Sequence, residues 1–587
     1  MVADVLFPVA LRRNLSYRIG EGMVAMVAVG VFVRAPIGNR TFLGVVLAIH
    51  ASGDSVALPT LKFITSIETH IAPVSPQRIM LWNWISEYYM CSLGEVMKAS
   101  LMTGRPVREL QKANRHPPPH LPLPELSASQ TDALGQIITH LQPAQAVLLT
   151  GARAKTDIYL HLLQHVLSSG KSVLFLLPEI GVGEQFYQQL KQWFGEGVFL
   201  FHSARTQAQR HDIIQQTAHR TEPFIVVGLR SALLLFDLAQ FGLIIVDEEH
   251  DIAYKQTDPA PRFHARDLAI VAGRHYHIPV LLGSSCASLE SQFNARTGKY
   301  HAVHLDDPTF APLQTEVVDT LRSSKKKQMA GMVSHALLHA LTQNLARQKQ
   351  ALLFCKRCAG LQEELQPLIP AARIARLDEP NTPSALRRLL QKFAQREIDL
   401  LIGTQTIHKG LAFDNIGVVG ILEADKQLHR QDFRAHERAY QIFTMLSHRM
   451  EGSPLVVIQA AQADYAFFDH FKHCDTESFV LEQLQERKDF GYPPFTRLIA
   501  LRFKHRTPEI SFEAAQRFAD ELPEIGITRL NGPFAPFHAP GAKLHTHLLW
   551  VYLPRHTKNE ELKKALYRKV INCSFPGGVV QVDVDPY

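Results

Sequence analysis

Cysteine is scarce in this chain: its 587 residues include only six, at scattered positions. So few cysteines cannot form the disulfide framework of a small secreted scaffold, and we expect reduced thiols. Cys355 and Cys358 form the single Cys-x-x-Cys pair of the sequence. Because tetrahedral zinc needs four ligands, we expect incidental thiols here and no zinc site.

Long hydrophobic runs are also missing. No apolar stretch reaches the length that spans a bilayer. The start, MVADVLFPVALRRN, lacks the basic residues, long apolar centre and cleavage site of a secretory signal. We therefore expect a cytoplasmic protein without membrane contact.

Basic residues do not gather in dense blocks, and the longest block is Lys325 to Lys327. The chain has 62 Lys plus Arg against 55 Asp plus Glu, a formal net charge of +7. This balance favours a polyanionic partner only weakly, and a mildly basic globular surface explains it equally well.

The N-terminal hundred residues contain short apolar runs separated by glycine-containing turns, which is typical of a small β-rich domain. The pattern predicts strands over 5–11, 15–19, 23–39 and 41–50. Apolar positions at helical spacing over 76–101 predict a helix that closes this domain. The next segment, HPPPHLPLPE, has five prolines in ten residues and predicts an extended linker.

Beyond the linker, short buried runs alternate with helical stretches. The first set is AVLLT, SVLFLLP, FIVVGL, LIIVDEE and IPVLLGSS, and the second is ALLFC, ARIARL, DLLIGT, GVVGILEAD and PLVVIQA. Continuous Val, Ile and Leu runs of this length suit a parallel sheet covered on both faces. The sequence therefore predicts an α/β fold with two lobes in tandem, followed by an α+β domain.

Two motifs carry chemistry. TGARAKTD, Thr150 to Asp157, has the strand, tight turn and helix of a phosphate-binding loop, but it keeps only one glycine, Gly151. LIIVDEEHD places Asp247 and Glu248 at the carboxyl edge of a parallel sheet, where such folds bind ligands. In nucleotide hydrolases the first acid holds Mg²⁺ and the second polarises the attacking water. A solvated acidic turn is the alternative, which the position after a candidate phosphate turn disfavours.

The order of motifs resembles the primosomal replication-restart helicases, the PriA family of superfamily 2 DNA helicases. The resemblance runs nearly end to end, through FPVALRRNLSYRIGEGM, LPEIGVGEQF, LRSALLLF, LIIVDEEHDIAYKQ, FHARDLA, GTQTIHKGLAF, DFRAHERAYQIFT, YPPFTRLIALR and VDVDP. It implies ATP-dependent 3′–5′ DNA helicase activity and five segments. These are a β-rich domain that binds 3′ DNA ends (1–105), a Pro-rich linker (106–125), two RecA-like lobes (126–322 and 323–475) and a C-terminal α+β domain (476–587).

The resemblance also locates a nucleotide site whose parts depart from the family pattern. The family's GxTGSGKT is GARAKT here, two residues shorter, which keeps Gly151, Lys155 and Thr156. Gln130 holds the adenine-contacting position. A loop that cradles phosphates needs glycine-permitted conformations and backbone N–H groups that point inward. We expect that ATP with Mg²⁺ is bound weakly, if at all, and that the ATP is not hydrolysed.

Two further losses concern the second lobe. The family's QxxGRxGR motif keeps its first arginine as Arg449 and has Gly452 at the second. Such arginines neutralise charge on the transferred phosphoryl group. Because the second one is missing, ATP hydrolysis by Asp247, Glu248 and Arg449 is expected to be very slow. The zinc-binding insertion of this lobe is also missing, and so is the winged-helix segment that the family has before the first lobe.

In the N-terminal domain, the resemblance implies a DNA-end pocket at Leu15, Ser16, Gly38 and Lys62. Lys62 can contact phosphate, and Gly38 permits close backbone approach. The family's Phe-Asp pair is Leu15-Ser16 here, which removes an aromatic stacking surface and a carboxylate acceptor.

The sequence thus predicts a degenerate PriA-like protein that binds branched or forked DNA. Its expected partners are primosome proteins such as single-strand-binding protein and the replicative helicase or its loader. One alternative is a weak DNA-dependent ATPase and 3′–5′ helicase that uses Lys155, Asp247 and Glu248. A second is a protein-interaction scaffold of the primosome without DNA affinity.

Overall fold

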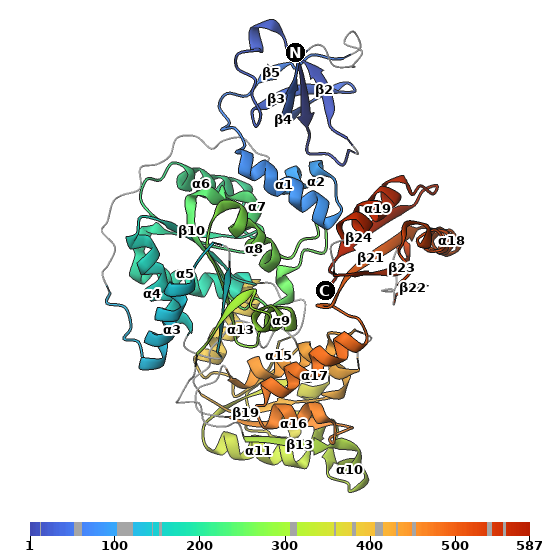
Figure 1. The fold of residues 1–587 in the computed structure, drawn as a ribbon. Coiled ribbons are helices and arrows are strands. Elements are labelled where there is room, and N and C mark those ends of the chain that lie inside the picture. Colours follow the sequence, from blue (N-terminus) through green and yellow to red (C-terminus); the bar gives the residue numbers. More distant parts are fainter. Residues whose placement is uncertain are drawn as a thin grey trace.

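The N-terminal domain is a five-stranded sheet closed by two helices (Figure 1). The computed structural model describes residues 1–11, 13–51, 61–101, 121–143, 145–151, 155–305, 314–356, 360–377, 383–404, 415–429, 432–448, 454–536, 543–555 and 559–587. The sheet has the order β2-β1-β4-β3-β5. Its elements are β1 (Val2–Leu6), β2 (Leu15–Arg18), β3 (Phe32–Ile37), β4 (Arg40–His50), β5 (Ser66–Ile67), α1 (Pro76–Tyr89) and α2 (Leu93–Ser100).

The strand expected over 23–39 is only partly correct. Met23 ends a short 3₁₀ helix (Glu21–Met23), residues 24–29 are turns and irregular chain, and the strand begins at Phe32. Met23 N donates to the Gly20 carbonyl, Val27 N donates to the Met23 carbonyl, and Gly30 has a φ of +91°. A left-handed glycine ends an extended segment, so the apolar run 23–29 cannot join the sheet.

Lobe 1 is a seven-stranded parallel sheet of order β12-β6-β11-β10-β7-β9-β8 with helices on both faces. Its strands other than the edge strand β12 are almost fully buried, which explains their continuous apolar sequences. The strands are β6 (Ala146–Thr150), β7 (Ser172–Leu176), β8 (Val198–Phe201), β9 (Ile225–Gly228), β10 (Phe241–Val246), β11 (Val280–Ser284) and β12 (Tyr300–His304). The helices are α3 (Ala128–His140), α4 (Lys155–Ser168), α5 (Ile180–Phe194), α6 (Gln207–Ala218), α7 (Ala232–Leu235), α8 (Ala265–Tyr276) and α9 (Leu289–Arg296).

Lobe 2 is a six-stranded parallel sheet of order β13-β20-β19-β16-β18-β17, beside a short hairpin, β14 (Met329–Ala330) and β15 (Val333–Ser334). The sheet strands are β13 (Gln314–Asp319), β16 (Gln350–Phe354), β17 (Ile374–Leu377), β18 (Leu400–Gly403), β19 (Ile416–Ile421) and β20 (Leu455–Ala460). The helices are α10 (Thr320–Lys325), α11 (His335–Ala346), α12 (Leu361–Leu368), α13 (Pro383–Ala394), α14 (Asp425–Leu428), α15 (Ala435–His448), α16 (Ala466–Lys472) and α17 (Thr476–Asp489). Two tandem parallel-sheet lobes are what the alternation of apolar runs predicts.

The C-terminal domain is a four-stranded antiparallel sheet of order β22-β23-β21-β24 with α18 and α19 against one face. Its elements are β21 (Thr496–His505), α18 (Pro508–Asp520), β22 (Leu530–Phe534), β23 (His545–Pro554), α19 (Asn559–Asn572) and β24 (Val579–Val584). Figure 1 shows this domain beside the junction of the two lobes, with the last residues of the chain lying at that junction. Within the described ranges, the helices are all too short or too polar to cross a membrane.

Candidate nucleotide and nucleic-acid sites

The expected phosphate-binding turn connects β6 to α4. Thr150 ends the strand and Lys155 begins the helix, so four residues separate them, of which 152–154 lie outside the described residues. Gly151 N donates to the Ser284 carbonyl over 3.2 Å. A Cβ at Gly151 would lie 2.9 Å from the Leu305 Cβ, so packing requires glycine at this position.

The lysine and threonine of this turn have different surroundings. Lys155 is 7% exposed, and its Nζ lies 3.2 Å from Glu248 Oε1 and donates to the Gly151 carbonyl over the same distance. Thr156 is exposed. The structure therefore brings Lys155 to the acidic motif and leaves Thr156 facing solvent.

The first two acids of LIIVDEEHD, Asp247 and Glu248, have protein donors. Tyr159 donates to Asp247 Oδ1 over 2.7 Å, and Ser285 donates to Glu248 Oε2 through its backbone N (2.9 Å) and its hydroxyl (2.7 Å). Burial raises the pKa of Tyr159 well above its ordinary value, and Asp247 adds to this effect, so the phenol stays protonated. Asp247 and Glu248 thus lie together at the carboxyl edge of lobe 1, as predicted.

The next acid in the motif has a structural role. Glu249 is completely buried and accepts hydrogen bonds from Arg266, from the backbone N and hydroxyl of Ser288, and from Ser291. Gln130 is also held within the protein. It forms a capping box with Ser127 at the start of α3, and its Nε2 donates to Asp157 Oδ2 over 3.0 Å.

The predicted residues of lobe 2 are only partly described. Arg449, Gly452 and Cys358 lie outside the described residues, whereas Cys355 is buried. Among the residues that the structure describes, no group of three or more His, Cys, Asp or Glu side chains is arranged to hold a metal ion.

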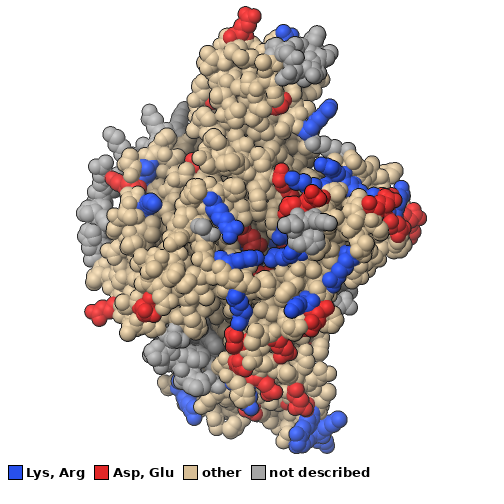
Figure 2. Space-filling model, viewed as in Figure 1, with Lys and Arg blue, Asp and Glu red and all other residues tan. Residues whose placement is uncertain are grey.

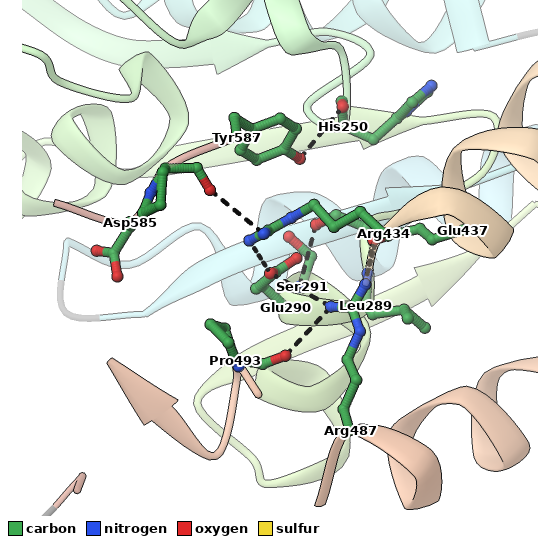
Figure 3. Close-up of polar contacts among 12 residues, drawn as sticks. His250, Leu289, Glu290, Ser291, Arg434, Glu437, Arg487, Pro493, Asp585 and Tyr587 are labelled. Atoms are coloured by element: carbon green, nitrogen blue, oxygen red, sulfur yellow. Dashed lines mark hydrogen bonds and ion pairs between the residues drawn. The ribbon is translucent and has the colours of Figure 1, made fainter. Parts of the chain in front are cut away.

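A buried cluster of charged side chains connects α9 of lobe 1 to α15 and α17 of lobe 2 (Figure 3). Arg434, which precedes α15, pairs with Glu290 of α9 over 2.7 Å. Arg487 of α17 pairs with Glu437 of α15 over 2.6 Å, and Glu437 also accepts from the Leu289 backbone N. Burial acts to raise the pKa of Glu290, but Arg434 and Arg487 outweigh it and hold that pKa well below its ordinary value. We call Glu290, Arg434, Glu437 and Arg487 the interlobe clamp.

The last residue of the chain lies against this clamp. The Arg434 guanidinium carbon is 4.7 Å from the centre of the Tyr587 ring, and the Tyr587 hydroxyl donates to the His250 carbonyl over 3.4 Å (Figure 3). Arg434 also donates to the Pro586 carbonyl. The C-terminal segment therefore contacts the acidic motif of lobe 1 and an arginine of lobe 2 at once.

The DNA-end residues predicted in the N-terminal domain lie on β2 and near it. Ser16 donates to Asp4 Oδ1 over 2.7 Å, and Lys62 is exposed and donates from Nζ to the Gly38 carbonyl over 2.9 Å. Leu15 is partly buried and packs against the core of this domain. Gly38 and Lys62 are thus brought together, and Leu15 contributes to the core.

Sequence reasoning missed several contacts of these sites. Tyr159 lies four residues after Lys155 in α4, and this helical spacing could have indicated that both face the acidic motif. Arg434 and Glu437 fall within DFRAHERAYQIFT, but no local pattern indicates that their partners are Glu290 and Arg487. Such contacts depend on how the two lobes meet.

Models of known families match each part of the chain. A DEAD/DEAH box helicase model matches residues 129–292, and a helicase conserved C-terminal domain matches residues 333–449. The two lobes are therefore the RecA-like pair of a superfamily 2 helicase, which confirms the predicted fold class.

The flanking domains narrow this class. A 3′DNA-binding domain model of PriA matches residues 4–102, and the primosomal protein N C-terminal domain matches residues 488–587. Curated proteins named "Replication restart protein PriA" are similar over most of the chain. The one from Rickettsia felis is 28% identical over 100% of this chain and 99% of its own, and that from Helicobacter pylori strain J99 is 29% identical over 95% of each. The Bacillus subtilis protein is 29% identical over 75% of this chain and 63% of its own. The chain is a PriA-like replication restart protein.

Proposed function

We propose that this PriA-like protein acts in replication restart by binding branched or forked DNA and helping to load the replicative helicase, with little or no ATP hydrolysis. One observation supports the proposed lack of ATP hydrolysis: only four residues connect β6 to α4. A phosphate-binding loop of the form Gly-x-x-x-x-Gly-Lys has six residues before its lysine. A four-residue connection is too short to wrap successive N–H groups around a triphosphate.

The residues around this connection do not fit ATP with Mg²⁺ for a second reason. Gly151 N already pairs with Ser284, and the Lys155 ammonium already pairs with buried Glu248. Carboxylates such as Asp247 and Glu248 are the ligand type that Mg²⁺ prefers. Without a phosphate cradle, however, the metal would lack the substrate oxygens that usually complete its shell. We therefore assign no chemical step to these residues.

Affinity for DNA is supported by the distribution of charge. Figure 2 shows Lys and Arg side chains gathered around the region where lobe 1, lobe 2 and the C-terminal domain meet. Cations along this junction of domains can neutralise phosphates of a DNA strand and release counterions. The match to a 3′DNA-binding domain supports a second contact region at the N-terminal end.

A salt series tests DNA binding. If roughly six phosphates are contacted, affinity for a forked oligonucleotide should fall about a thousand-fold or more between ~50 and ~200 mM salt. Fluorescence anisotropy in the presence and absence of ATP measures this dependence. We expect the same curve in both. A shift of the curve by ATP would favour a nucleotide-driven protein, and the absence of salt-dependent binding would favour the scaffold without DNA affinity.

A second candidate is a weak DNA-dependent ATPase. One observation favours it: Lys155, Asp247 and Glu248 still lie together at the edge of the lobe 1 sheet. Titration of a fluorescent ATP analogue with Mg²⁺ separates the two candidates. Tight, saturable binding that Lys155→Ala abolishes would support the ATPase, whereas our proposal expects no saturation at micromolar concentration.

The protein partners belong to the same proposal. We propose single-strand-binding protein and the replicative helicase or its loader, in the cytoplasm, because a fork-binding protein without a motor acts by recruiting other proteins. Co-sedimentation on forked DNA with each purified partner tests this. Recruitment should persist without nucleotide.

A further inference from the structure

The residues that follow β24 leave the C-terminal sheet through an anchored turn. Asp585 has a φ of +49°, a left-handed conformation that is uncommon outside glycine and persists only where neighbours hold it. Its backbone N donates to a carbonyl of β21 over 2.9 Å, and its carboxylate accepts from the Tyr88 hydroxyl over 2.7 Å. Burial acts to raise the pKa of Asp585, but Arg497 and the Tyr88 hydrogen bond outweigh it and keep that pKa below its ordinary value. The anchored turn directs Pro586 and Tyr587 toward the junction of the two lobes (Figure 1).

Tyr587 lies between groups of both lobes (Figure 3). On the side of lobe 1, the ring centre of His264 is 5.0 Å from that of Tyr587, and the His250 carbonyl accepts from the Tyr587 hydroxyl. On the side of lobe 2, the guanidinium carbons of Arg434 and Arg438 lie 4.7 and 5.5 Å from the centre of the ring. Burial raises the pKa of Tyr587, so its hydroxyl keeps the proton that it donates. One aromatic side chain therefore contacts lobe 1 and lobe 2 at the same time.

The groups around this ring are enclosed by protein. His264 is 1% exposed and Arg434 is 3% exposed. A cation–π contact becomes stronger when water is kept from the cation. Pro586 adds a backbone contact, because its carbonyl accepts from Arg434 Nη1 over 3.3 Å. Since the segment is tethered to the C-terminal domain, its effective concentration at the junction is also high.

A group bound between two domains favours the arrangement in which it touches both of them. In hinged proteins this group is usually a ligand, which shifts the equilibrium toward the closed form because it binds that form more tightly. Here the chain itself supplies such a group. Closure of the lobes then does not depend on nucleotide.

We propose that residues 585–587 form a latch that keeps lobe 2 closed against lobe 1 independently of nucleotide. This inference rests on the proposed absence of ATP turnover and adds how the two lobes keep one arrangement without it. Because the latch continues directly from β24, it also couples the position of the C-terminal domain to that of both lobes. A DNA fork then meets the lobes and the C-terminal domain as one rigid surface.

Single-molecule fluorescence energy transfer between the lobes tests the latch in the full-length protein. The dyes are attached at Gln136 of α3 and Thr342 of α11, which are both exposed. The wild type should give one narrow distribution of transfer efficiency that ATP with Mg²⁺ leaves unchanged. Tyr587→Ala should raise the population of an open form by about ten- to thirty-fold, the factor that loss of a desolvated cation–π contact implies.

Two further variants serve as controls. Tyr587→Phe keeps the ring and loses only a hydrogen bond of 3.4 Å, so it should give the wild-type distribution. Tyr465→Ala removes a 38% exposed tyrosine of lobe 2 and should also leave the distribution unchanged. A wild-type distribution in Tyr587→Ala, or a wild-type distribution that ATP narrows, would overturn the latch.

A double-mutant cycle separates the latch from a general loss of stability. Arg438→Gln should open the lobes less than Tyr587→Ala does, because Arg434 remains beside the ring. Adding Arg438→Gln to Tyr587→Ala should open them no further, since the two side chains act through one contact. Fully additive effects would show that Tyr587 does not act through lobe 2 and would overturn the latch.

The distance measurement needs no DNA, so it can fail separately from the proposed function. Fork-stimulated ATP hydrolysis with unchanged distances between the lobes would contradict the proposed function and leave the latch in place. A broad distribution in a wild-type protein that binds forks without ATP hydrolysis would overturn the latch alone.

Discussion

Arg487→Ala is expected to lower the free energy of unfolding by about 3 to 5 kcal/mol, because it removes the ion-pair partner of the buried Glu437 carboxylate. The Arg487 side chain is 2% exposed and pairs with Glu437, which is 4% exposed. It also donates to the Pro493 carbonyl and lies 3.4 Å from Glu290. Urea unfolding followed by circular dichroism measures the loss, with the transition of lobe 2 fitted separately because large multidomain chains unfold in steps.

The chain offers a matched control for this variant. Arg296 of α9 pairs with Glu477 of α17 over 2.8 Å, so it also links lobe 1 to this helix, but its side chain is 32% exposed and that of Glu477 is 64% exposed. Arg296→Ala should therefore cost only about 0 to 1 kcal/mol. Equal losses in the two variants would contradict a special role for the buried clamp.

Lys255→Ala is the second change with a large expected effect. Lys255 Nζ lies 2.9 Å from Asp583 and donates to the carbonyls of Arg262 and Val584, each over 2.8 Å. Its side chain is 1% exposed, and it ties the segment after the acidic motif to β24 of the C-terminal domain. Loss of the cation leaves Asp583 with Arg502 as its remaining ion-pair partner in the described part of the chain. The expected cost is about 3 kcal/mol or more.

Thermal unfolding and limited proteolysis measure this effect. Lys255→Ala should unfold at a lower temperature and release a protease-resistant C-terminal fragment sooner than the wild type. Lys326→Ala, an exposed lysine, should behave as the wild type does. Wild-type stability and wild-type proteolysis of Lys255→Ala would show that this ion pair does not hold the C-terminal domain to lobe 1.

The buried strands of the lobes could be predicted because each is short, apolar and almost fully enclosed. AVLLT, LIIVDEE and IPVLLGSS correspond to β6, β10 and β11. The same reasoning was wrong for 23–29, where the apolar composition is that of a strand. Tight turns and left-handed Gly30 decide the conformation there, and Met26 is 54% exposed.

Only part of the acidic motif could be predicted from the sequence. A strand followed by acids at the edge of a parallel sheet predicts the position of Asp247 and Glu248. The sequence could not show that Glu249 is a structural residue, because its partners Arg266 and Ser288 come from 17 and 39 residues further along the chain. The interlobe clamp depends on still more distant pairs, such as Glu290 with Arg434, which only the packing of the lobes brings together.

Phosphate release in the presence of forked DNA tests whether this chain binds forks without hydrolysing ATP. We expect wild type and Asp247→Asn to release phosphate at the same background rate, with or without the fork. Fork-stimulated release by the wild type that Asp247→Asn abolishes would contradict the claim and establish a working motor.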